Sequence, residues 1–485
     1  MCARNRQCFD SVAPVSGNVS NVPMNLTHCA LINKLRACVL FSACFALLGC
    51  VSYHAKPLPA TPDLAATLDE LKTDLPDTPV LPIRQHRFDL SDGLDRDEVA
   101  TLAVVNNGDL KTARDRAGVA HAQAFAAGLL PNPQLGLALD SPRSSDLSLV
   151  TAYSLGLSYD INLLIQRSAV QRAAVSEARR ADLNLLWQEW QVVARARLLF
   201  VSATAQERAL GLLQSERELF RQRYLHAQKA LDEGNIAIDQ VSAYLSALQA
   251  VDRRINDLER QTVGTRHDLN ALLGLAPEVR LDLVRGADLP EIDATAIRRL
   301  LPDLPRRRPD LLALQAGYQA QEERLRESVL AQFPAFNLGI TRARDTGGIQ
   351  TEGLAIGLTL PLFNRNQGNI AIQNATRKQL YDEYQARLNT AYSDVDRILQ
   401  NQELLEAQKK ELESSLAEMN RVSAAAETAF REKIMDALHY TSLRTSLINK
   451  QIEAIDLERL LLEQRVALQT VIGGELPLKP QGKAR

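Results

Sequence analysis

Apolar and polar residues alternate in four short segments of the chain, which predicts four β-strands. The segments are residues 134–140, 153–161, 336–340 and 354–360. Successive side chains of a strand point to opposite faces, so alternation with a period of two is the strand pattern. Polar turn residues at 141–146 and 345–348 separate the members of each pair. The segments therefore predict two β-hairpins, for which ordinary hairpins of a soluble domain are an alternative interpretation.

Two long stretches without proline, residues 168–232 and 369–430, predict helices of unusual length. At a rise of 1.5 Å per residue, the first would extend for roughly 100 Å. In the second, the apolar residues that repeat every seven positions, as in a coiled-coil seam, are Ile398, Leu405, Leu412 and Met419. Return helices are expected at 239–273 and 436–472, so each half predicts an antiparallel helical hairpin. The polar surface of these helices suits a solvent-bridging role or the lining of a hydrated space.

The body of the chain repeats one plan of strands and helices. Pro133, Gly156 and Gly274 have counterparts about 200 residues later, and a repeat of this length is a duplication rather than an array of short units. The predicted boundaries are a first repeat at 94–290 (strands about 133–162, helices about 166–274), a second repeat at 291–474 (strands about 334–362, helices about 368–472) and a tail at 475–485.

All six cysteines lie within the first 50 residues, where the sequence resembles a secretory leader. Lys34 and Arg36 precede an apolar stretch at 37–48, which is the pattern of a signal peptide. We therefore predict a signal peptide at 1–49. Because the apolar stretch begins unusually late, Met24 is an alternative start of translation.

The end of the leader predicts a lipid anchor. The residues at 47–50 read Leu-Leu-Gly-Cys and resemble the bacterial lipobox, in which the cysteine is acylated and becomes the first residue. Cys50 is therefore the predicted lipidation site, and the alternative is cleavage elsewhere with an incidental Cys50. Residues 50–93 are rich in proline, which disfavours helix, and predict a linker.

The composition and the missing catalytic motifs argue against a nucleic-acid partner and against an enzyme. The formal charge is −2 over 485 residues, whereas nucleic-acid-binding chains usually carry a basic patch. The sequence contains no HExxH, GxSxG or GxxxxGK[ST] motif. Its seven histidines are scattered without an i,i+4 pair. We expect no catalytic site, no cofactor and no resident metal.

Any insertion into a membrane would have to use the strands or a lipid. After the leader, the chain has no apolar run of the roughly 20 residues that a helical span needs. Among β-structures only closed barrels are stable in lipid, because an open edge leaves backbone groups unpaired. Known bacterial barrels start at about eight strands. If the four strands are inserted, several chains must share one barrel.

Three motifs, together with the duplicated plan, resemble the TolC-like outer-membrane efflux factors. The motifs are AAGLLPNPQL at 126–135, RRPDLLAL at 307–314 and LPLFNRNQGNIA at 360–371. The third motif is most similar to the CzcC-like heavy-metal branch of that family. The resemblance covers the chain from about residue 94 to about residue 474.

The resemblance implies an α+β membrane protein of the outer membrane. Each chain of a homotrimer would supply four strands to a shared twelve-stranded β-barrel, and long antiparallel coiled-coil helices would form a periplasmic α-barrel of twelve helices. The expected partners are a periplasmic adaptor, an inner-membrane pump and outer-membrane lipid. The expected function is a passive exit duct of a tripartite efflux system, with heavy-metal cations as substrate. A multidrug or organic-compound channel and a lipid-anchored periplasmic coiled-coil scaffold are the alternatives.

The ends of the helical hairpins, residues 232–240 and 431–439, are the predicted gate, since the resemblance implies that they constrict the tunnel. Acidic side chains repeated by symmetry at a constriction select cations. The candidate gate and selectivity residues are Asp239, Asp436 and His439. Asp239 and Asp436 lie just beyond the two turns, at positions that we interpret as equivalent. An N-cap role for both aspartates is the alternative.

His439 stands where the resemblance predicts a second aspartate. A histidine there would make the gate sensitive to pH, because the free imidazole has a pKa of about 6.5; the alternative is an ordinary solvated helix residue. The resemblance also makes the two turns the expected docking points of the adaptor. The residues concerned are Gly234, Asn235, Arg431, Glu432 and Lys433.

Overall fold

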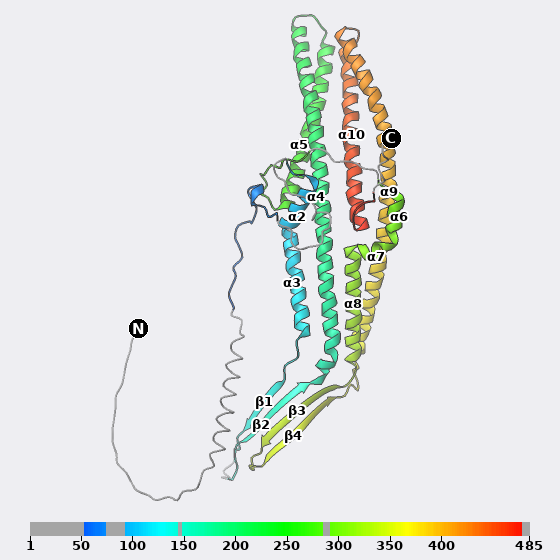
Figure 1. Cartoon of the computed structure of the whole chain (residues 1–485). Coiled ribbons are helices and arrows are strands. Elements are labelled where there is room, and N and C mark those ends of the chain that lie inside the picture. The colour runs from blue at the N-terminus through cyan, green and yellow to red at the C-terminus, as the bar shows by residue number, and fades with distance from the viewer. Residues whose placement is uncertain (1–52, 74–92, 144–147, 285–291, 478–485) are drawn as a thin grey trace, which may run out of the picture. The chain divides into compact units, whose positions relative to one another are not determined.

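The computed structural model of the chain describes four stretches, residues 53–73, 93–143, 148–284 and 292–477. The predicted signal peptide and Cys50 lie outside these residues. The chain divides into two compact units, Met1–Pro62 and Asp63–Arg485. The described residues of the first unit, 53–62, contain no helix or strand. All helices and strands below belong to the second unit, which is mostly helical (Figure 1).

The four predicted strands are present and form one antiparallel sheet in the order β1-β2-β3-β4. They are β1 (Gln134–Asp140), β2 (Ala152–Asp160), β3 (Ala335–Arg344) and β4 (Gln350–Thr359). β2 pairs with β3 although the two strands come from different halves of the chain. Leu157 of β2 lies opposite Leu135 of β1 and opposite Ile340 of β3. Because of this register, side chains that alternate along one strand line up across the whole sheet.

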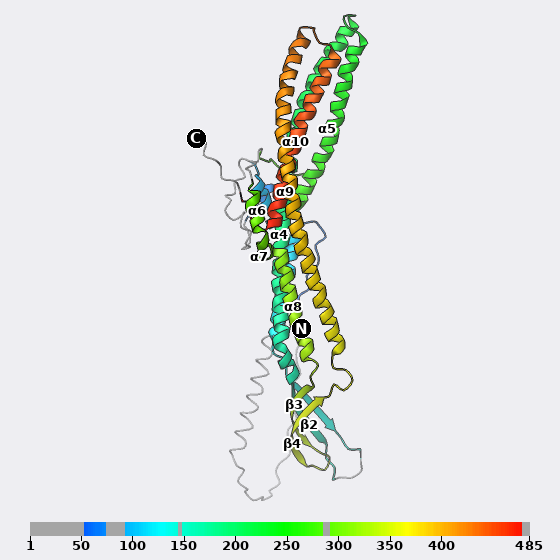
Figure 2. The same ribbon diagram turned by 90° about the vertical axis from the view of Figure 1, so that its right-hand side faces the viewer.

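Four long helices form two antiparallel hairpins. They are α4 (Ile161–Asp232), α5 (Ile238–Leu273), α9 (Gln367–Arg431) and α10 (Ala437–Ile472). α4 has 72 residues and α9 has 65, which correspond to lengths of about 110 and 100 Å. α4 follows β2 directly and α9 follows β4, so the sheet lies at the ends of these helices that are far from the hairpin turns (Figures 1 and 2). Among the described residues, no helix is both long and apolar enough to cross a membrane.

Shorter helices pack against the middle of the long helices and against their sheet-side halves. They are the single turn η1 (Leu68–Glu70), α2 (Arg96–Asn106), α3 (Gly108–Gly128), α6 (Ala294–Leu300), the turn η2 (Leu301–Asp303), α7 (Leu304–Arg307) and α8 (Pro309–Leu330). α3 packs on α4, and α8 packs on both α4 and α9. α8 therefore joins the two halves of the chain between the sheet and the hairpins.

Two apolar clusters lie where the short helices meet the long ones. The first includes Leu102 of α2 and Phe200 of α4, and the second includes Leu311 of α8 and Val395 of α9. Each of these side chains is almost completely withdrawn from solvent. Each cluster joins the middle of α4 or α9 to the C-terminal end of its return helix, α5 or α10, so the hairpin ends extend from a packed base.

The motif RRPDLLAL forms a buried charged contact beside the second cluster. The guanidinium of Arg308 donates to the two carboxylate oxygens of Asp310 at 3.0 and 2.8 Å. The same guanidinium lies 5.2 Å from the centre of the Trp187 ring of α4. Arg387 of α9 donates to Asp310 as well, at 2.6 Å. The motif therefore ties α8 to both long helices, which explains its part in the fold.

Candidate functional site

The sheet has one apolar face that no other described part of the chain covers. In one row across the strands, Leu135, Leu157, Ile340 and Leu354 lie side by side. Their exposed fractions are 70%, 43%, 60% and 65%. Leaving apolar surface in water costs about 25 cal/mol for each Å². A sheet with this face requires an apolar environment that the single chain does not provide.

The opposite face of the sheet carries small and polar residues. The adjacent row consists of Gly136, Gly156, Thr341 and Gly353, and further rows contain glycine, alanine, serine, threonine, asparagine, glutamine and aspartate. These residues tolerate water and leave space in front of the sheet. The two faces therefore suit two different surroundings, lipid on one side and water on the other.

Both edges of the sheet are open within the described residues. β1 pairs with β2 alone, and β4 pairs with β3 alone. Every residue of β1 and of β4 is exposed. Unpaired edge strands offer rows of free N–H and C=O groups to another chain. The sheet therefore combines a bare apolar face with two edges that are able to pair with further strands.

The turns at the far ends of the hairpins have the same backbone conformation. Gly234 in the first turn and Lys433 in the second have φ values of 76° and 62°. In each turn the next residue donates its backbone N–H to a carbonyl five residues earlier, at 2.8 Å, from Asn235 to Ala230 and from Ile434 to Ala429. This pattern closes a helix C-terminus.

The second turn places a lysine in a conformation that favours glycine. A left-handed conformation strains an ordinary residue by about 1–2 kcal/mol. Lys433 is exposed, as are the other residues predicted for adaptor docking, which are Gly234, Asn235, Arg431 and Glu432. All five residues lie at the turns or directly beside them, and their role in docking stays a prediction.

Asp436 and His439 form one contact at the start of α10. One carboxylate oxygen of Asp436 accepts the backbone N–H of His439 at 2.9 Å, and the other lies 2.7 Å from its Nδ1 atom. The hydrogen bonds from the backbone and side chain of His439 lower the pKa of Asp436. Both side chains remain exposed. The N-cap interpretation is confirmed for Asp436, whose role at a gate stays a prediction.

Asp239 is placed differently, and two expectations about it were wrong. The N-cap of α5 is Ala237, and no side chain caps this helix. Counted from the left-handed residue of each turn, Ala237 is the counterpart of Asp436, whereas Asp239 lies two residues further on. Asp239 is therefore an exposed residue of the first helical turn, neither a cap nor the equivalent of Asp436. The candidate gate residues do not form a matched acidic pair within one chain.

Sequence reasoning missed a charged and aromatic cluster that joins the two hairpins near their ends. Arg223 of α4 donates to both oxygens of Glu427 of α9, at 2.9 and 3.2 Å, and to the Tyr440 hydroxyl of α10 at 3.2 Å. Its guanidinium lies 4.8 and 4.6 Å from the ring centres of Phe430 and Tyr440, within the distance of a cation–π contact. We call Arg223, Glu427, Phe430 and Tyr440 the hairpin lock.

The hairpin lock holds its members in defined protonation states. Tyr440 is fully buried and donates its hydroxyl to Glu427. Burial and this bond to a carboxylate raise the pKa of Tyr440 to about 12. Burial works against ionisation of Glu427, but the hydrogen bond from Tyr440 and the charge of Arg223 outweigh it and lower the pKa of Glu427. At neutral pH the lock therefore contains a carboxylate and a phenol.

Closer to the sheet, polar pairs link α4 and α10. Arg444 of α10 donates to Glu216 of α4 at 2.6 Å, and Arg208 of α4 donates to Glu458 at 2.7 Å. An apolar cluster with Phe220 lies among these pairs. The seam between the hairpins thus alternates polar and apolar contacts over much of its length.

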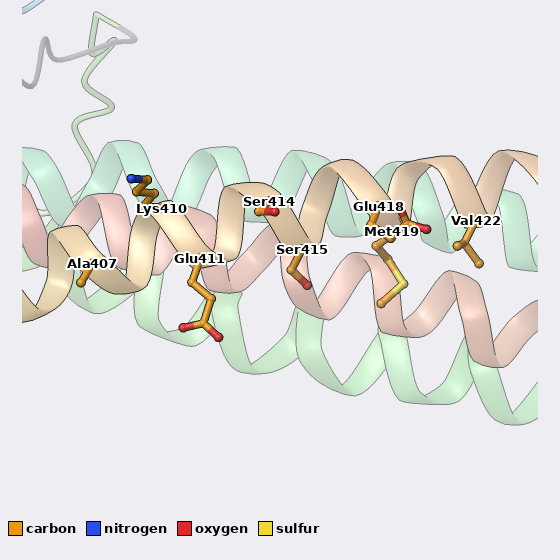
Figure 3. Close-up of a pocket in the computed structure, with 8 residues that line it drawn as sticks. All are labelled: Ala407, Lys410, Glu411, Ser414, Ser415, Glu418, Met419 and Val422. Carbon is orange, nitrogen blue, oxygen red and sulfur yellow. The ribbon is translucent and has the colours of Figure 1, made fainter.

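The long helices also present open surfaces. A groove of about 810 Å³ on α9 is lined by residues of that helix alone, among them Ala407, Glu411, Ser414 and Glu418 (Figure 3). Since a single helix lines it, it is a helix face rather than an enclosed binding cavity. Within the described stretches, no group of three or more histidine, cysteine, aspartate or glutamate residues is arranged to hold a metal ion.

Comparison with known proteins finds outer-membrane export proteins that are similar to this chain. Residues 300–474 match the family model described as "Outer membrane efflux protein". The chain is 25% identical over 423 residues to the pyoverdine export outer membrane protein OpmQ of Pseudomonas aeruginosa, covering 80% of this chain and 87% of OpmQ. It is 24% identical over 372 residues to the multidrug resistance outer membrane protein MdtP of Escherichia coli, covering 71% and 73%.

A cation exporter and a solved channel are also similar. The cation efflux system protein CusC of Escherichia coli is 24% identical over 405 residues, covering 78% of this chain and 86% of CusC. The CmeC outer membrane channel of Campylobacter jejuni has the same fold, with a TM-score of 0.69 at 16% identity over 89% of this chain and 95% of CmeC. These proteins are outer-membrane exporters and channels, which supports the expectation that the chain is not an enzyme.

Proposed function

We propose that this chain belongs to the outer membrane efflux protein family, whose model matches residues 300–474, and that it is the passive exit duct of a tripartite efflux system. Three copies would join their four-stranded sheets edge to edge into a twelve-stranded barrel in the outer membrane. The long hairpins would form a twelve-helix tunnel in the periplasm. The observation that carries the proposal is the sheet with one bare apolar face, one small and polar face, and two open edges.

The proposed assembly satisfies each of these features physically. Edge-to-edge joining of β1 to β4 of the next copy would pair the free backbone groups, which lipid requires. The apolar face would lie against lipid, and the small, polar face would border a water-filled bore. Four strands are too few to close a barrel alone, since known bacterial barrels start at about eight. A duct of this kind needs no energy source of its own, and the inner-membrane pump would supply it.

The hairpin turns would form the periplasmic entrance. The hairpin lock supports a closed entrance, because Arg223, Glu427 and Tyr440 join the two hairpins close to their turns. Widening the entrance requires the hairpins to separate and these contacts to break. Asp436 and His439, and separately Asp239, are the candidate selectivity residues near the turns. The exposed turns would receive the adaptor, and binding of the adaptor would offset the cost of breaking the lock.

For the cargo we propose heavy-metal cations, delivered by the pump and adaptor. The segment LPLFNRNQGNIA supports this choice through its similarity to the heavy-metal branch, and CusC is named as a cation efflux protein. The competing cargo is an organic compound or drug, which the name of MdtP favours. A passive duct requires no tight metal site, since conduction needs sites weak enough to release the ion.

Gene deletion and complementation test the cargo. We would compare growth of the deletion strain on zinc, cobalt, cadmium, nickel, copper and silver salts, and on a panel of drugs and detergents. Sensitivity to metals that the intact gene reverses is the expected result. Sensitivity confined to drugs would reject the metal cargo and retain the duct.

Conductance and oligomeric state test the duct itself. The exported protein in detergent should migrate as a heat-modifiable oligomer and should form ion-conducting pores in planar lipid bilayers. A lipid-anchored scaffold, the alternative of another class, would remain an elongated species and would conduct no ions. Acylation of Cys50, which the duct does not require, is tested by mass spectrometry of the N-terminal peptide of the exported chain.

A further inference from the structure

The loop between β4 and α9, residues 360–366, displays apolar side chains to solvent. Leu360 and Leu362 are exposed, and Phe363 has an exposed fraction of 94%, the highest of any large apolar residue among the described stretches. A phenylalanine in this state is unusual, because aromatic side chains carry a large apolar surface. The loop belongs to the segment LPLFNRNQGNIA, whose local role the duct alone does not explain.

Hydrogen bonds impose the exposure of Phe363. Asn366 has a left-handed backbone (φ 60°). Its N–H donates to the side-chain oxygen of Asn364 at 2.9 Å. The side-chain amide of Asn366 donates to the carbonyl of Ser328 in α8 at 2.8 Å. The side-chain amide of Gln367 donates to the carbonyl of Phe363 at 3.4 Å. The loop is therefore fixed to α8 in a conformation that directs Phe363 outward.

The loop continues the apolar face of the sheet. Exposed apolar residues occupy every second position from Leu354 to Leu362. The part within β4, Leu354 to Leu358, spans only about 13 Å at 3.3 Å per residue. Leu360 and Leu362 add to the run beyond the strand, where the hydrogen bond from the Leu362 N–H to the Leu360 carbonyl turns the chain. The apolar band of a membrane barrel is about 25 Å tall, so the strand alone is too short to supply it, and the loop enlarges the apolar surface at this end.

At its other end, the apolar run on β3 and β4 meets a charged pair. Beyond Leu354 on the same face, Arg342 and Glu352 form an ion pair at 3.6 Å. Charged pairs belong outside the hydrocarbon region. On β3 and β4 the apolar run ends at this pair, whereas Leu155 and Leu137 continue the apolar face at the same level on β2 and β1. On β3 and β4, further apolar surface therefore lies only in the direction of the loop.

The start of α4 has the same character. Leu163, Leu164 and Ile165 are consecutive residues near its first turn, and all three are exposed. Consecutive residues of a helix point about 100° apart, so apolar side chains project to several sides of the helix at this level. The start of α4, which directly follows the sheet, therefore adds exposed apolar surface at this end of the apolar face.

We propose that residues 360–363 are a lipid anchor that inserts into the periplasmic boundary of the outer membrane, with Phe363 at the level where acyl chains meet headgroups. Aromatic side chains favour this boundary. Arg365, exposed two residues later, would reach the lipid phosphates. The membrane would then extend past the strand ends onto the first turns of the helices. This inference rests on the proposed duct, since it requires the apolar face to lie in lipid.

Site-directed fluorescence tests the anchor in the exported full-length protein. No cysteine occurs beyond Cys50, so single substitutions introduce one site for a polarity-sensitive probe, and unsubstituted protein measures the background. The test variant is Phe363→Cys. Ile356→Cys, on the apolar face of the strand, and Leu404→Cys, on an exposed face of α9 in the middle of the hairpin, are the controls. The protein is reconstituted into vesicles of phosphatidylethanolamine and phosphatidylglycerol, brominated either near the headgroup or near the chain end.

The anchor predicts a blue shift for the probe at 363 and a loss of intensity that is largest with bromine near the headgroup. The probe at 356 should lose more intensity with deep bromine, and the probe at 404 should respond only to aqueous iodide. A probe at 363 that iodide quenches and bromine does not, beside a quenched probe at 356, overturns the anchor alone. A blue-shifted probe at 363 that neither quencher reaches lies against a second copy of the chain and also overturns it. Loss of bromine quenching at both 363 and 356 overturns the duct.

Discussion

Neutralising Glu427 should loosen the contact between the two helical hairpins near their turns. Glu427→Gln keeps the size and shape of the side chain and removes its charge. The carboxylate accepts hydrogen bonds from Arg223, Tyr440 and Arg431. The amide group cannot accept all of them, and it leaves the guanidinium of Arg223 between two rings without its counter-charge. The hairpins should therefore separate more often at their ends, while the packed base stays intact.

The size of the effect follows from the contacts and their exposure. Hydrogen bonds that involve a charged group contribute about 1.5–3 kcal/mol. The side chains of Arg223 and Glu427 are 20% and 28% exposed, so the larger penalties measured for completely buried ion pairs do not apply. A loss of about 1.5–3 kcal/mol increases the population of separated hairpins by about 10- to 150-fold.

Pulsed electron paramagnetic resonance measures this population directly. Spin labels on cysteines introduced at Asn235 and Glu432, one in each turn, report the distance between the hairpin ends, with labelled chains diluted into unlabelled ones. Glu418→Gln is the matched control. Glu418 pairs with Arg421 of its own helix, so the substitution removes a charge without changing the contact between the hairpins. A longer-distance population should appear in Glu427→Gln and not in the control. If both variants give the distance distribution of the unmodified protein, the lock does not hold the hairpins together.

The lock should also respond to acid. The pKa of Glu427 is lowered from the ordinary value of 4.5, so its contribution is complete above about pH 4.5 and is lost as the pH falls through the lower, folded-state pKa. Tyr440 has a raised pKa of about 12, so its contribution persists below about pH 10 and is lost only near pH 12. The labelled hairpins should stay close at neutral pH and separate in acid, a change that Glu427→Gln should abolish.

Three further substitutions test other parts of the structure. Asp436→Ala removes the cap of α10 and should lower the stability of this helix end by about 1 kcal/mol. Hydrogen exchange should become faster in the first turn of α10, whereas Asp239→Ala should leave exchange at the start of α5 unchanged. Lys433→Gly removes the strain of a left-handed lysine, at some cost in the entropy of the unfolded chain, and should raise the free energy of unfolding by about 0.5–1 kcal/mol. Thermal unfolding measures the change, and a lower melting temperature would contradict the strain at Lys433. Ile340→Arg on the apolar face should cost about 2–4 kcal/mol in the membrane and reduce the heat-modifiable oligomer, whereas Thr341→Arg, one residue along on the opposite face, should have little effect; equal losses would contradict the two-faced sheet.

The division of contacts along the chain suits a duct with a fixed base and a movable end. Around Phe200 and Leu311 the packing is apolar and almost completely buried. Toward the turns, smaller apolar clusters alternate with charged pairs such as Arg444 with Glu216. Polar contacts lose less on separation than apolar ones, because water replaces their hydrogen bonds. Separation of the hairpins should therefore begin at the turns and stop at the base.

The sequence alone predicted the elements whose signals are local. Alternation around Leu135 and Leu354 identified strands, because the side-chain period of a strand is visible in any short segment. The absence of proline identified the long helices, and their turns were expected where the turns occur. The resemblance of three motifs to the outer-membrane efflux factors was also carried by short segments, and comparison with known proteins supports it.

Only the tertiary structure decided how distant segments meet. Arg223 and Glu427 are 204 positions apart, and no local pattern relates them, so the hairpin lock had no signal in the sequence. The pairing of Asp239 with Asp436 failed because the position that corresponds to Asp436, the N-cap of the return helix, is held by Ala237 in the first repeat. Only the matching turn geometry of the two repeats shows that Asp239 lies two residues beyond that position. The bare apolar face depended on the register of four strands, and the outward direction of Phe363 depended on a hydrogen bond from Asn366 to a distant helix. Periodicity is a property of one segment, whereas register, burial and hydrogen bonding between segments exist only when the chain is folded.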